Sequence, residues 1–564
     1  MKSVNGINWK ENNIPERLIL KNKQKYNISY LLSKIFLDKK YSEEEIYNSI
    51  YKIQQKEIIY KNQDFANASK FIFDCYKNKK KILIFGDYDV DGYSSVYLLY
   101  DFLTNLDINC NYFIPNRLLD GYGPNKLLLE KLIKNNNYDL IIFVDCGSNS
   151  LEEIKYLENN GLNIIIIDHH QIHEEKKFKK TVIINPLKNV TEKQYFSFCA
   201  TSLVYLFIKY LITTLKTNHN IDLNKYLFFS AIATICDQMP MRGNNKSIVI
   251  NGLNNFKFNN FKNFNKLLNL KNRLMVNDIS FSLGPILNSA GRLGYSDLPL
   301  TLLIEKNKLN IEKISQRLMF LNDKRKKIQS KTFQLLIKNS VNSKIEVIFN
   351  YKNNINEGLL GIIAANLVEL YNKPSFVLTN SGKLIKCSSR SVHGFDIGNI
   401  FYLAIKKKII LKGGGHSMAG GCVLEKNKLQ DFKKFINSCY YKKFKKFKNS
   451  KLYVSEQNLE SLLIFAKHDL KKLEPFGNNN ANPFFLVKSN KIIKFKIIKD
   501  THIQVIINNK NNKSYSGFAF NAIGTKLGQL LMNSKKEIDL ILQINNRFIQ
   551  KNSDFNLIIK DAIA

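Results

Sequence analysis

Short, uninterrupted apolar runs alternate with helical patterns through the first half of the chain. The three clearest runs are Lys81–Phe85, Leu140–Phe143 and Asn163–Ile167. Continuous apolar runs of this length indicate strands buried on both faces of a parallel sheet. Residues 94–102 and 151–159 lie between them and predict crossover helices. Repeated βαβ units of this kind predict an α/β domain built on a doubly wound parallel sheet.

The second half of the chain changes pattern twice. From residue 310 to residue 339 there is no Gly or Pro, and apolar residues recur at 3-4-3 spacing, which predicts one long connecting helix. Residues 345–425 predict a second α/β unit. After Pro483 the pattern becomes short strands separated by turns, which is typical of a small all-β barrel. The predicted strands are 495–498, 502–507, 539–544 and 556–559.

A chain of 564 residues is too long for one hydrophobic core, so several domains are expected. Trp9, the only tryptophan, receives no role from the sequence. The expected segments are an N-terminal helical segment (1–75), the parallel-sheet domain (76–270), a motif segment with the connecting helix (271–340), the second α/β domain (341–440) and the barrel (450–564).

The predicted strands end on carboxylates and histidines. The first is followed by Gly86-Asp87-Tyr88-Asp89-Val90-Asp91-Gly92, the second by Asp145, and the third by Asp168-His169-His170. Residues 226–236 are apolar nearly all round and predict a buried helix that delivers Asp237. Ligands of open α/β sheets collect at the carboxyl ends of the strands. Aspartate and histidine suit divalent metals, and an acidic cluster suits two ions, so the residues predict phosphate-ester hydrolysis.

A simpler interpretation exists for each aspartate taken alone. An Asp after a strand commonly caps the next helix, and this applies most directly to Asp91. Capping does not explain the triplet Asp168-His169-His170 or the recurrence of acidic strand ends. A dinucleotide site is disfavoured, because Gly86-Asp87-Tyr88-Asp89 lacks the Gly-x-Gly-x-x-Gly spacing.

These motifs, in this order, resemble the DHH phosphoesterase superfamily from about residue 75 to the C-terminus, and within it a bacterial branch of single-strand-specific exonucleases. The resemblance implies that Asp145 bridges two Mn²⁺ or Mg²⁺ ions, that His170 faces the phosphate or leaving group, and that Asp91 and Asp168 orient the ligands. An imidazole ligand shifts the preference toward Mn²⁺. The implied metal ligands are Asp87, Asp89, Asp145, His169 and Asp237.

Three further motifs carry the same resemblance, within residues 115–123, 284–294 and 357–421. It implies that their polar and glycine residues bind the substrate. An ordinary surface loop remains the alternative for Arg117 and Tyr122, and an ordinary surface charge for Arg292. A structural role remains the alternative for His416. The implied substrate-binding residues are Arg117, Tyr122, Asn288, Ser289, Arg292, Ser388, Arg390, Gly414, Gly415 and His416.

The chain departs from this family at two places beside the motifs. Cys236 stands where relatives usually have Ala, and Ile355-Asn356 stands where they usually have Trp-His. Asn356 can form hydrogen bonds but cannot act as an acid near neutral pH. Cys236 is either a metal-sensitive thiol or simply a small buried residue.

The resemblance implies a 5′→3′ exonuclease that releases mononucleotides from single-stranded DNA in recombination and repair, with an OB-fold barrel that holds the strand. It also implies a helicase and a single-stranded-DNA-binding protein as partners. The residues alone predict only phosphoester hydrolysis. Two alternatives stay open: a DHH phosphodiesterase acting on short oligonucleotides or cyclic dinucleotides, and a degenerate scaffold that binds single-stranded DNA without cleaving it.

Composition adds less. The net charge of +38 suits a polyanionic partner, although the abundance of Lys, Asn and Ile is equally typical of an AT-rich genome. Eight cysteines without a CxxC pair argue against zinc fingers and a disulfide framework. No apolar run suits a membrane span or signal peptide, so a cytoplasmic protein without membrane contact is expected.

Overall fold

The computed structural model describes residues 1–51, 63–172, 176, 178–188, 198–215, 221–256, 262–268, 274–339, 346–392, 394–443, 450–508, 513–534, 536–545 and 556–563. They form two compact units. The first contains Met1–Ile58, Pro240–Ser247 and Lys448–Ala564, and the second contains Ile59–Met239 and Ile248–Phe447. The domain boundaries predicted at residues 270 and 340 lie outside the described residues.

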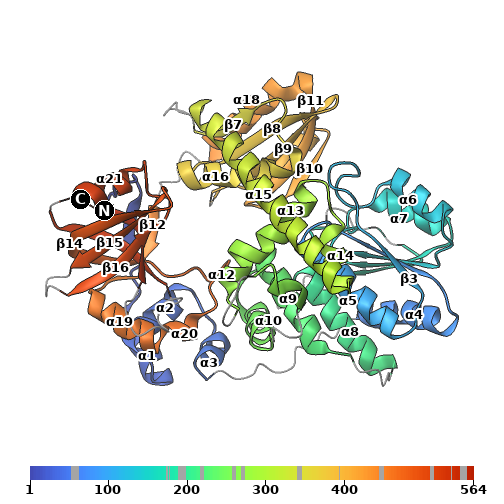
Figure 1. Cartoon of the computed structure of the whole chain (residues 1–564), viewed down its shortest axis with the longest axis horizontal. Coiled ribbons are helices and arrows are strands. Elements are labelled where there is room, and N and C mark those ends of the chain that lie inside the picture. Colours follow the sequence, from blue (N-terminus) through green and yellow to red (C-terminus); the bar gives the residue numbers. More distant parts are fainter. Residues whose placement is uncertain are drawn as a thin grey trace. The chain divides into compact units, whose positions relative to one another are not determined.

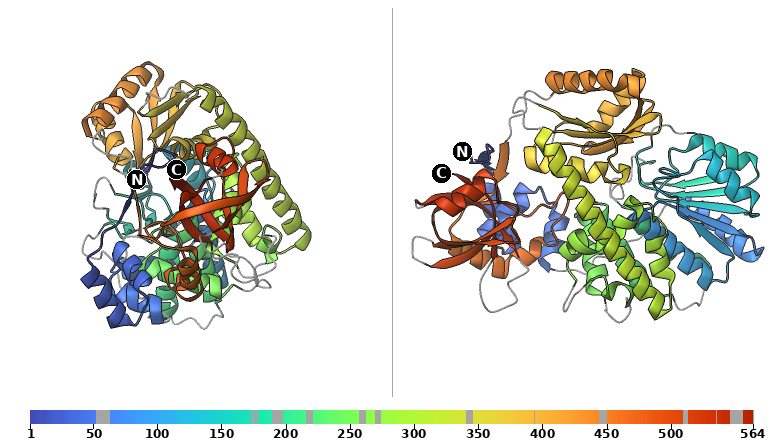
Figure 2. Two further views of the ribbon diagram at one scale, coloured as in Figure 1. Left: turned by 90° about the vertical axis from the view of Figure 1, so that its left-hand side faces the viewer. Right: turned by 45° about the horizontal axis from the view of Figure 1, so that its top comes forward.

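The second unit contains the predicted parallel sheet, with helices on both faces (Figure 2). Its order is β3 (Cys110–Phe113), β2 (Ile82–Gly86), β4 (Leu140–Val144), β5 (Asn163–Ile167) and β6 (Thr181–Ile184). All four pairings are parallel. The chain leaves β2 toward β3 on one side and later adds β4 on the other side. The β2–β4 junction is therefore the topological switch point, where such sheets bind ligands.

Packing follows from the apolar runs. Every residue of β2 and β4 is buried, as expected of strands covered on both faces. Helix α5 (Val90–Asn105) is buried along most of its length and packs against α8 (Ala200–Leu215) and α9 (Leu223–Cys236). The predicted buried helix is thus α9, and Asp237 is its C-terminal cap.

The predicted connecting helix is α15 (Lys308–Asn339), the long helix in Figure 1. It packs against α13 (Gly284–Arg292), α14 (Leu298–Ile304) and α16 (Leu360–Tyr371). Because α13 and α14 also pack on α5 of the first α/β domain while α16 packs on the second sheet, α15 joins the two α/β domains of this unit.

The second sheet of this unit is mixed. Its order is β10 (Lys412–Gly415), β11 (Ala419–Glu425), β9 (Leu384–Arg390), β8 (Ser375–Ser381) and β7 (Ile348–Tyr351). Only the β7–β8 pairing is parallel. Helices α17 (Ile397–Lys406) and α18 (Leu429–Lys443) contribute to its buried core. The expected second α/β domain is therefore present.

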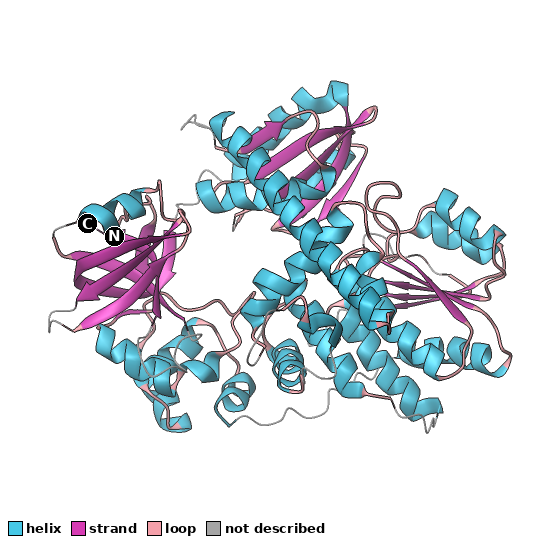
Figure 3. Cartoon of the chain, in the orientation of Figure 1, coloured by secondary structure: helices cyan, strands magenta, loops and turns pink. Residues whose placement is uncertain are grey.

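The first unit contains the barrel, whose strands are seen with the other sheets in Figure 3. It consists of β14 (Phe485–Ile498), β15 (His502–Asn508), β16 (Ser514–Ala519), β18 (Asn556–Ile563) and β17 (Ile538–Asn545), and β17 closes on β14. The sequence pattern missed β16, because Ser514-Tyr515-Ser516-Gly517 interrupts its apolar positions.

The N-terminal segment contributes a strand as well as helices to this unit. Strand β1 (Asn8–Glu11) pairs in parallel with β12 (Ser450–Tyr453). Helices α1 (Glu16–Tyr26), α2 (Tyr30–Asp38) and α3 (Glu43–Tyr51) supply residues to the core of the barrel. The two ends of the chain meet here (Figure 1), where the Val4 N–H donates to the Ala562 carbonyl oxygen over 3.0 Å. No helix among the described residues is long and apolar enough to cross a bilayer.

Trp9 is the side chain that ties these two ends together. It is 1% exposed and packs with Tyr453, Leu486 and Ile541. Its Nε1–H donates to Asp561 Oδ2 over 2.8 Å, and Asn5 Nδ2 donates to the other oxygen over 3.0 Å. The Asp561 carboxylate is itself fully buried. The structure thus gives the only tryptophan a role that its position in the sequence does not reveal.

We expect Asp561→Ala to destabilise the first unit by about 2–3 kcal/mol, because it leaves the buried Trp9 N–H without an acceptor. Urea unfolding followed by Trp9 fluorescence measures this directly, since no other tryptophan contributes. The exposed Glu537→Ala variant is the control and should unfold like the unaltered protein. Equal midpoints for the two variants would show that the hydrogen bond contributes nothing.

Candidate metal centre

The first acidic loop joins β2 to α5 at the switch point. Asp89 caps α5, because its Oδ1 accepts the N–H groups of Asp91 and Gly92 over 3.0 and 3.1 Å. Asp87 is 3% exposed, and its Oδ1 is buried without a hydrogen-bond donor. Gly92 permits this tight turn, since a Cβ there would lie 2.4 Å from the Asp87 carbonyl oxygen. The loop therefore presents two carboxylates toward the end of β4.

Asp145 follows β4 and completes the first group of ligands. It is 2% exposed, and its Oδ1 lacks a hydrogen-bond donor, like that of Asp87. Its φ of 60° places it in the left-handed region, which aspartate adopts more readily than most other non-glycine residues. Ligand atoms of Asp87, Asp89 and Asp145 lie within 4.8 Å of one another. This spacing suits a divalent cation held by carboxylate oxygens.

His169 connects this group with Asp237. Its Nε2 lies 3.2 Å from Asp145 Oδ1 and 3.6 Å from both Asp91 Oδ2 and Asp237 Oδ2. Two further groups therefore meet the same spacing, Asp91–His169–Asp237 and Asp145–His169–His170. Asp145 and His169 belong to more than one group, so the geometry suits two neighbouring ions that share ligands.

Asp91 and Asp168 are engaged by backbone N–H groups. The Asp91 carboxylate accepts the N–H groups of Ala200 and Thr201 at the start of α8, each over 2.8 Å. The Asp168 carboxylate accepts the N–H groups of Ser148, His169 and His170. Capping and metal binding are thus not exclusive. Asp91 caps the distant helix α8 rather than its own helix. Asp89 caps α5 through Oδ1 alone, so its Oδ2 is not used in capping.

Burial and mutual repulsion dominate the electrostatics of the cluster. Burial and the neighbouring carboxylates raise the pKa values of Asp87, Asp145 and Asp237 well above the usual range for aspartate. Burial, together with the positive charge of His170, lowers the pKa of His169 to about 4, so its imidazole is neutral and able to ligate a metal. A cation would relieve the repulsion among the three carboxylates.

His170 differs from His169 because it has its own carboxylate partner. Its Nδ1 lies 2.7 Å from Asp168 Oδ1. Burial opposes its charge, but Asp168 prevails and raises the pKa of His170 to about 9. Burial would likewise raise the pKa of Asp168, yet the adjoining His170 holds it well below the usual range. The pair is therefore an imidazolium–carboxylate pair at neutral pH.

The residues present fit a pair of Mn²⁺ or Mg²⁺ ions. Two buried carboxylate oxygens, on Asp87 and Asp145, have no donor among the described residues, and buried polar atoms are rarely left without a partner. Oxygen donors with one imidazole match the preferences of Mn²⁺ and Mg²⁺ better than those of softer metals. The predicted ligands Asp87, Asp89, Asp145, His169 and Asp237 are brought together, and their ligation of metal stays a prediction.

Three arginines of the predicted substrate site also converge. Burial lowers the pKa of Arg292 to about 9, and the positive charges of Arg117 and Arg390 act in the same direction. No described carboxylate forms an ion pair with any of the three. Arg390 lies against Gly361, where a Cβ would be 3.2 Å from its Nη2. Uncompensated arginines of this kind are typical of phosphate recognition.

The loop that carries Arg117 is fixed to the end of α13. Asn116 Nδ2 donates to the Gly294 carbonyl oxygen over 2.8 Å, and the Arg117 N–H donates to Ser296 Oγ over 3.2 Å. The Arg117 guanidinium lies 4.8 Å from the ring centroid of Tyr88, between the two acidic residues of the first loop. The motifs did not predict Tyr88 as a residue of the site, although its position between Asp87 and Asp89 in the sequence places it there.

Aromatic rings from both domains of this unit line the cluster. Tyr122 Oη donates to the Asp145 carbonyl oxygen over 3.2 Å, and the Tyr122 ring meets that of His170 edge to face at 5.8 Å. On the other side, the His416 ring stacks with His170 at a centroid distance of 6.3 Å. His416 therefore faces the metal cluster from the second α/β domain.

The other predicted substrate residues lie close by, some in structural roles. Asn288 Oδ1 accepts the Val90 N–H over 3.1 Å, and the buried Ser289 Oγ donates to the Ile286 carbonyl oxygen. Ser388 faces Gly361 beside Arg390, and Gly414 and Gly415 belong to β10. Asn288 and Ser289 thus hold the acidic loop and α13, and contact of these five residues with substrate stays a prediction.

The two departures from the family also have structural explanations. Cys236 Sγ lies where a Cβ on Gly284 would approach to 2.6 Å, so the thiol fills space against α13. Asn356 Oδ1 accepts the Gly358 N–H over 3.0 Å at the start of the short helix Glu357–Leu359. The Gly358 carbonyl oxygen then accepts Arg292 Nη1 over 3.0 Å. Asn356 therefore helps to orient an arginine of the site.

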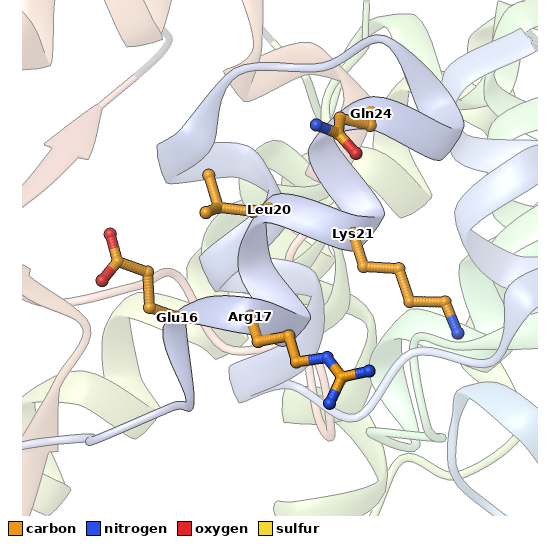
Figure 4. Close-up of a pocket in the computed structure, with 5 residues that line it drawn as sticks. All are labelled: Glu16, Arg17, Leu20, Lys21 and Gln24. Atoms are coloured by element: carbon orange, nitrogen blue, oxygen red, sulfur yellow. The ribbon is translucent and has the colours of Figure 1, made fainter.

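A separate surface depression lies on α1 (Figure 4). It shares no residue with the acidic cluster, and one acidic and two basic side chains of a single helix line it. Its lining residues are Glu16, Arg17, Leu20, Lys21 and Gln24.

Comparison with known proteins identifies three parts of the chain. Residues 81–234 match the N-terminal domain of the DHH family, residues 344–442 match the DHHA1 domain, and residues 456–561 match the RecJ OB domain. The single-stranded-DNA-specific exonuclease RecJ of Bacillus subtilis is 26% identical over 460 residues, which cover 79% of this chain and 57% of that protein. The RecJ exonuclease of Salmonella typhimurium is 24% identical over 526 residues, covering 88% of this chain and 89% of that protein.

A solved structure shows the same fold. RecJ from Thermus thermophilus in complex with Mn²⁺ superposes with a TM-score of 0.82 at 18% identity, covering 99% of this chain and 80% of that one. The same protein with Mg²⁺ gives a TM-score of 0.77 at 17% identity. The matched region nevertheless spans little more than half of the Bacillus subtilis relative's length.

We expect Mn²⁺ to raise the melting temperature of the unaltered protein by about 5–10 °C when present at about 100 times its dissociation constant. Asp145→Asn should abolish most of this rise, because the shared ligand is lost. Asp107→Asn is the matched control, since Asp107 is exposed and has a similar φ of 55°. A full metal-induced rise in Asp145→Asn, measured by differential scanning fluorimetry, would contradict the assignment.

The same measurement should depend on pH. The unfolded aspartates ionise near pH 4, whereas the raised pKa values of Asp87, Asp145 and Asp237 make the folded protein keep its protons to higher pH. The metal-free protein therefore loses stability as the pH rises from the pKa of an unfolded aspartate to the raised pKa of the same aspartate in the folded protein. Because Mn²⁺ must displace the protons, its stabilisation should grow from pH 5.5 to pH 8. A constant shift across this range would indicate that these carboxylates do not ligate the metal.

Proposed function

Since the chain belongs to the DHH family of phosphoesterases and carries the three domains of its RecJ branch, we propose that it is a metal-dependent exonuclease. It hydrolyses single-stranded DNA in the 5′→3′ direction to mononucleotides, in recombination and repair. One observation carries the proposal: buried carboxylates, two of them with unpartnered oxygens, gather with His169 at the switch point of the sheet, beside three arginines that form no ion pair with a described carboxylate. Such a site holds a metal and a phosphate together.

Bound Mn²⁺ or Mg²⁺ would lower the pKa of a coordinated water and offset the negative charge on the phosphoryl oxygens. The chain supplies the remaining elements. The His170–Asp168 pair keeps a proton on the imidazole at neutral pH, and the ring faces both Tyr122 and His416. His170 therefore holds a hydrogen-bond donor ready for a phosphoryl or leaving-group oxygen.

The arginines suit recognition of the strand itself. Arg117, Arg292 and Arg390 provide planar donors that match phosphate oxygens, and Gly361 leaves room beside Arg390. We place the 5′ phosphate at Ser388 and Arg390. The rings of His170 and His416 approach within 6.3 Å across the two domains. We attribute the selectivity for single strands to a channel between the two α/β domains that is too narrow for a duplex.

The barrel offers a second surface for the strand. Pairing places Lys496 opposite Gln504 and Gln504 opposite Phe518, so these side chains share the face that points away from the barrel core. The rings of Phe518 and Phe520 stack at 6.3 Å, and Phe520 is 52% exposed. Exposed rings beside lysines are the usual elements of single-strand binding. This surface and the net charge of +38 support a nucleic-acid substrate.

We further propose that the protein acts beside a helicase, which supplies single strands, and a single-stranded-DNA-binding protein, which covers them. None of the eight cysteines, all of them within the described residues, forms a disulfide bond, as suits the reducing cytoplasm. The barrel argues against a phosphodiesterase confined to short oligonucleotides or cyclic dinucleotides. The complete set of acidic ligands argues against a non-catalytic scaffold.

A time course on 3′-labelled DNA tests the proposal. With Mn²⁺, the label on a single strand should appear in progressively shorter fragments, while a blunt duplex should persist. Asp87→Asn should lower the rate at least about 1000-fold, because the site loses a ligand that offsets charge in the transition state. Asp107→Asn again serves as the control. Strand binding without cleavage would favour the scaffold, and cleavage of only the shortest oligonucleotides would favour the small-substrate enzyme.

A further inference from the structure

The buried face of α15 changes character along its length. Toward its start, the buried positions are apolar except for Ser315 and include Ile311, Leu318 and Leu321. Toward its end, Leu336 joins the core that α16 shares with the second sheet. Between these apolar stretches the inward positions are polar: Asn322 is 5% exposed, Arg325 is 9% exposed, and Gln329 is half-buried. The polar stretch therefore lies where α15 passes from one α/β domain to the other.

Arg325 is the charged member of this stretch, and it has only neutral partners. Its Nη1 donates to Gln329 Oε1 over 2.8 Å, and its Nη2 donates to Asn322 Oδ1. Its Nε is buried without an acceptor. No carboxylate among the described residues forms an ion pair with it, and the exposed Asp323, which pairs with Lys326, acts on it only through longer-range attraction. A buried cation without an anion is costly, so a protein seldom retains one that serves only stability.

The surroundings of Arg325 indicate which anion it meets. Helix α15 packs against α13, which ends in Arg292, and against α16, which follows the short helix Glu357–Leu359. Arg292 joins these two elements by donating to the Gly358 carbonyl oxygen. The charge of Arg325 contributes to the lowered pKa of Arg292, as do the charges of Arg117 and Arg390. Arg292 and Arg325 therefore belong to two helices that pack against each other, and neither forms an ion pair with a described carboxylate.

We propose that Arg325 binds a phosphate of the substrate strand, next to the phosphate held by Arg292. The inference rests on the proposed function and adds a contact to it. Asn322 and Gln329 hold the guanidinium from two sides through their side-chain oxygens and leave its Nε–H unused. Phosphate oxygens would satisfy that donor and compensate the charge. The energetic cost of burying Arg325 is then offset only when a strand is bound.

The first test measures strand binding without cleavage. A fluorescein-labelled, 5′-phosphorylated oligothymidylate is titrated with protein in EDTA at several KCl concentrations, and anisotropy gives the affinity. We expect Arg325→Gln to bind about ten times more weakly at low salt. The slope of log affinity against log salt should fall by roughly 0.7, the value for one phosphate contact on a single strand. Arg325→Lys should recover part of the slope.

Arg317→Gln is the matched control. Arg317 lies on the same helix, is exposed, and contacts Tyr295 rather than the arginine cluster. It removes the same charge and should leave both the affinity and the slope unchanged. An equal loss in both variants would overturn the proposal, because it would show a general effect of net charge.

The second test separates binding from a structural role. Arg325→Met replaces the cation with an apolar side chain of similar length and should melt at the same temperature as the metal-free unaltered protein or a few degrees higher. A lower melting temperature together with an unchanged salt slope would show that Arg325 is structural. If Arg325→Gln binds and cleaves normally, only this inference fails. If the unaltered protein binds no strand, both this inference and the proposed function fail.

Discussion

Mutual repulsion among buried carboxylates is the constraint on which this structure depends. Asp87, Asp89 and Asp145 hold their ligand atoms within 4.8 Å of one another, and His169 lies within 3.6 Å of both Asp145 and Asp237. Nothing in their own chemistry favours this proximity without a cation. The apolar runs of β2 and β4 enforce it, because they fix two adjacent strand ends at the switch point of the sheet. The core therefore provides the free energy that keeps the site assembled.

The same division of labour governs the positive side of the site. The arginines of the site come from the loop after β3, from α13, from α15 and from β9. They form no ion pairs with described carboxylates, and the packing of these elements holds their backbones in place. The aspartate cluster and the arginines lie near each other but form no direct ion pairs, since such pairs would neutralise both groups. A metal and a phosphate, bound together, would complete the charge balance that the polypeptide leaves open.

Local patterns predicted the elements that depend on local physics. The buried strands, the connecting helix α15, the closed barrel and the family all followed from apolar runs and motifs, and each was confirmed. Other features depend on contacts between distant residues. Asp91 caps α8 more than a hundred residues away, and Trp9 meets Asp561 across 552 positions. Arg325 lies in the run Asp323-Lys324-Arg325-Lys326-Lys327, which reads as a solvated helix face, and only packing shows that Arg325 alone is buried.

The pairing of β1 with β12 and the Trp9–Asp561 hydrogen bond have a consequence for biosynthesis. The first unit is assembled from both ends of the chain, while nearly all of the second unit lies between them. A ribosome delivers the N-terminal segment, then the α/β domains, and last the barrel strands. The α/β domains can complete their own cores as they emerge. The N-terminal strand and helices must wait, with their apolar faces uncovered, until the last strand of the barrel is released. A chain interrupted late in translation would therefore carry an assembled metal centre and an exposed, aggregation-prone N-terminus, which makes it a natural client for chaperones.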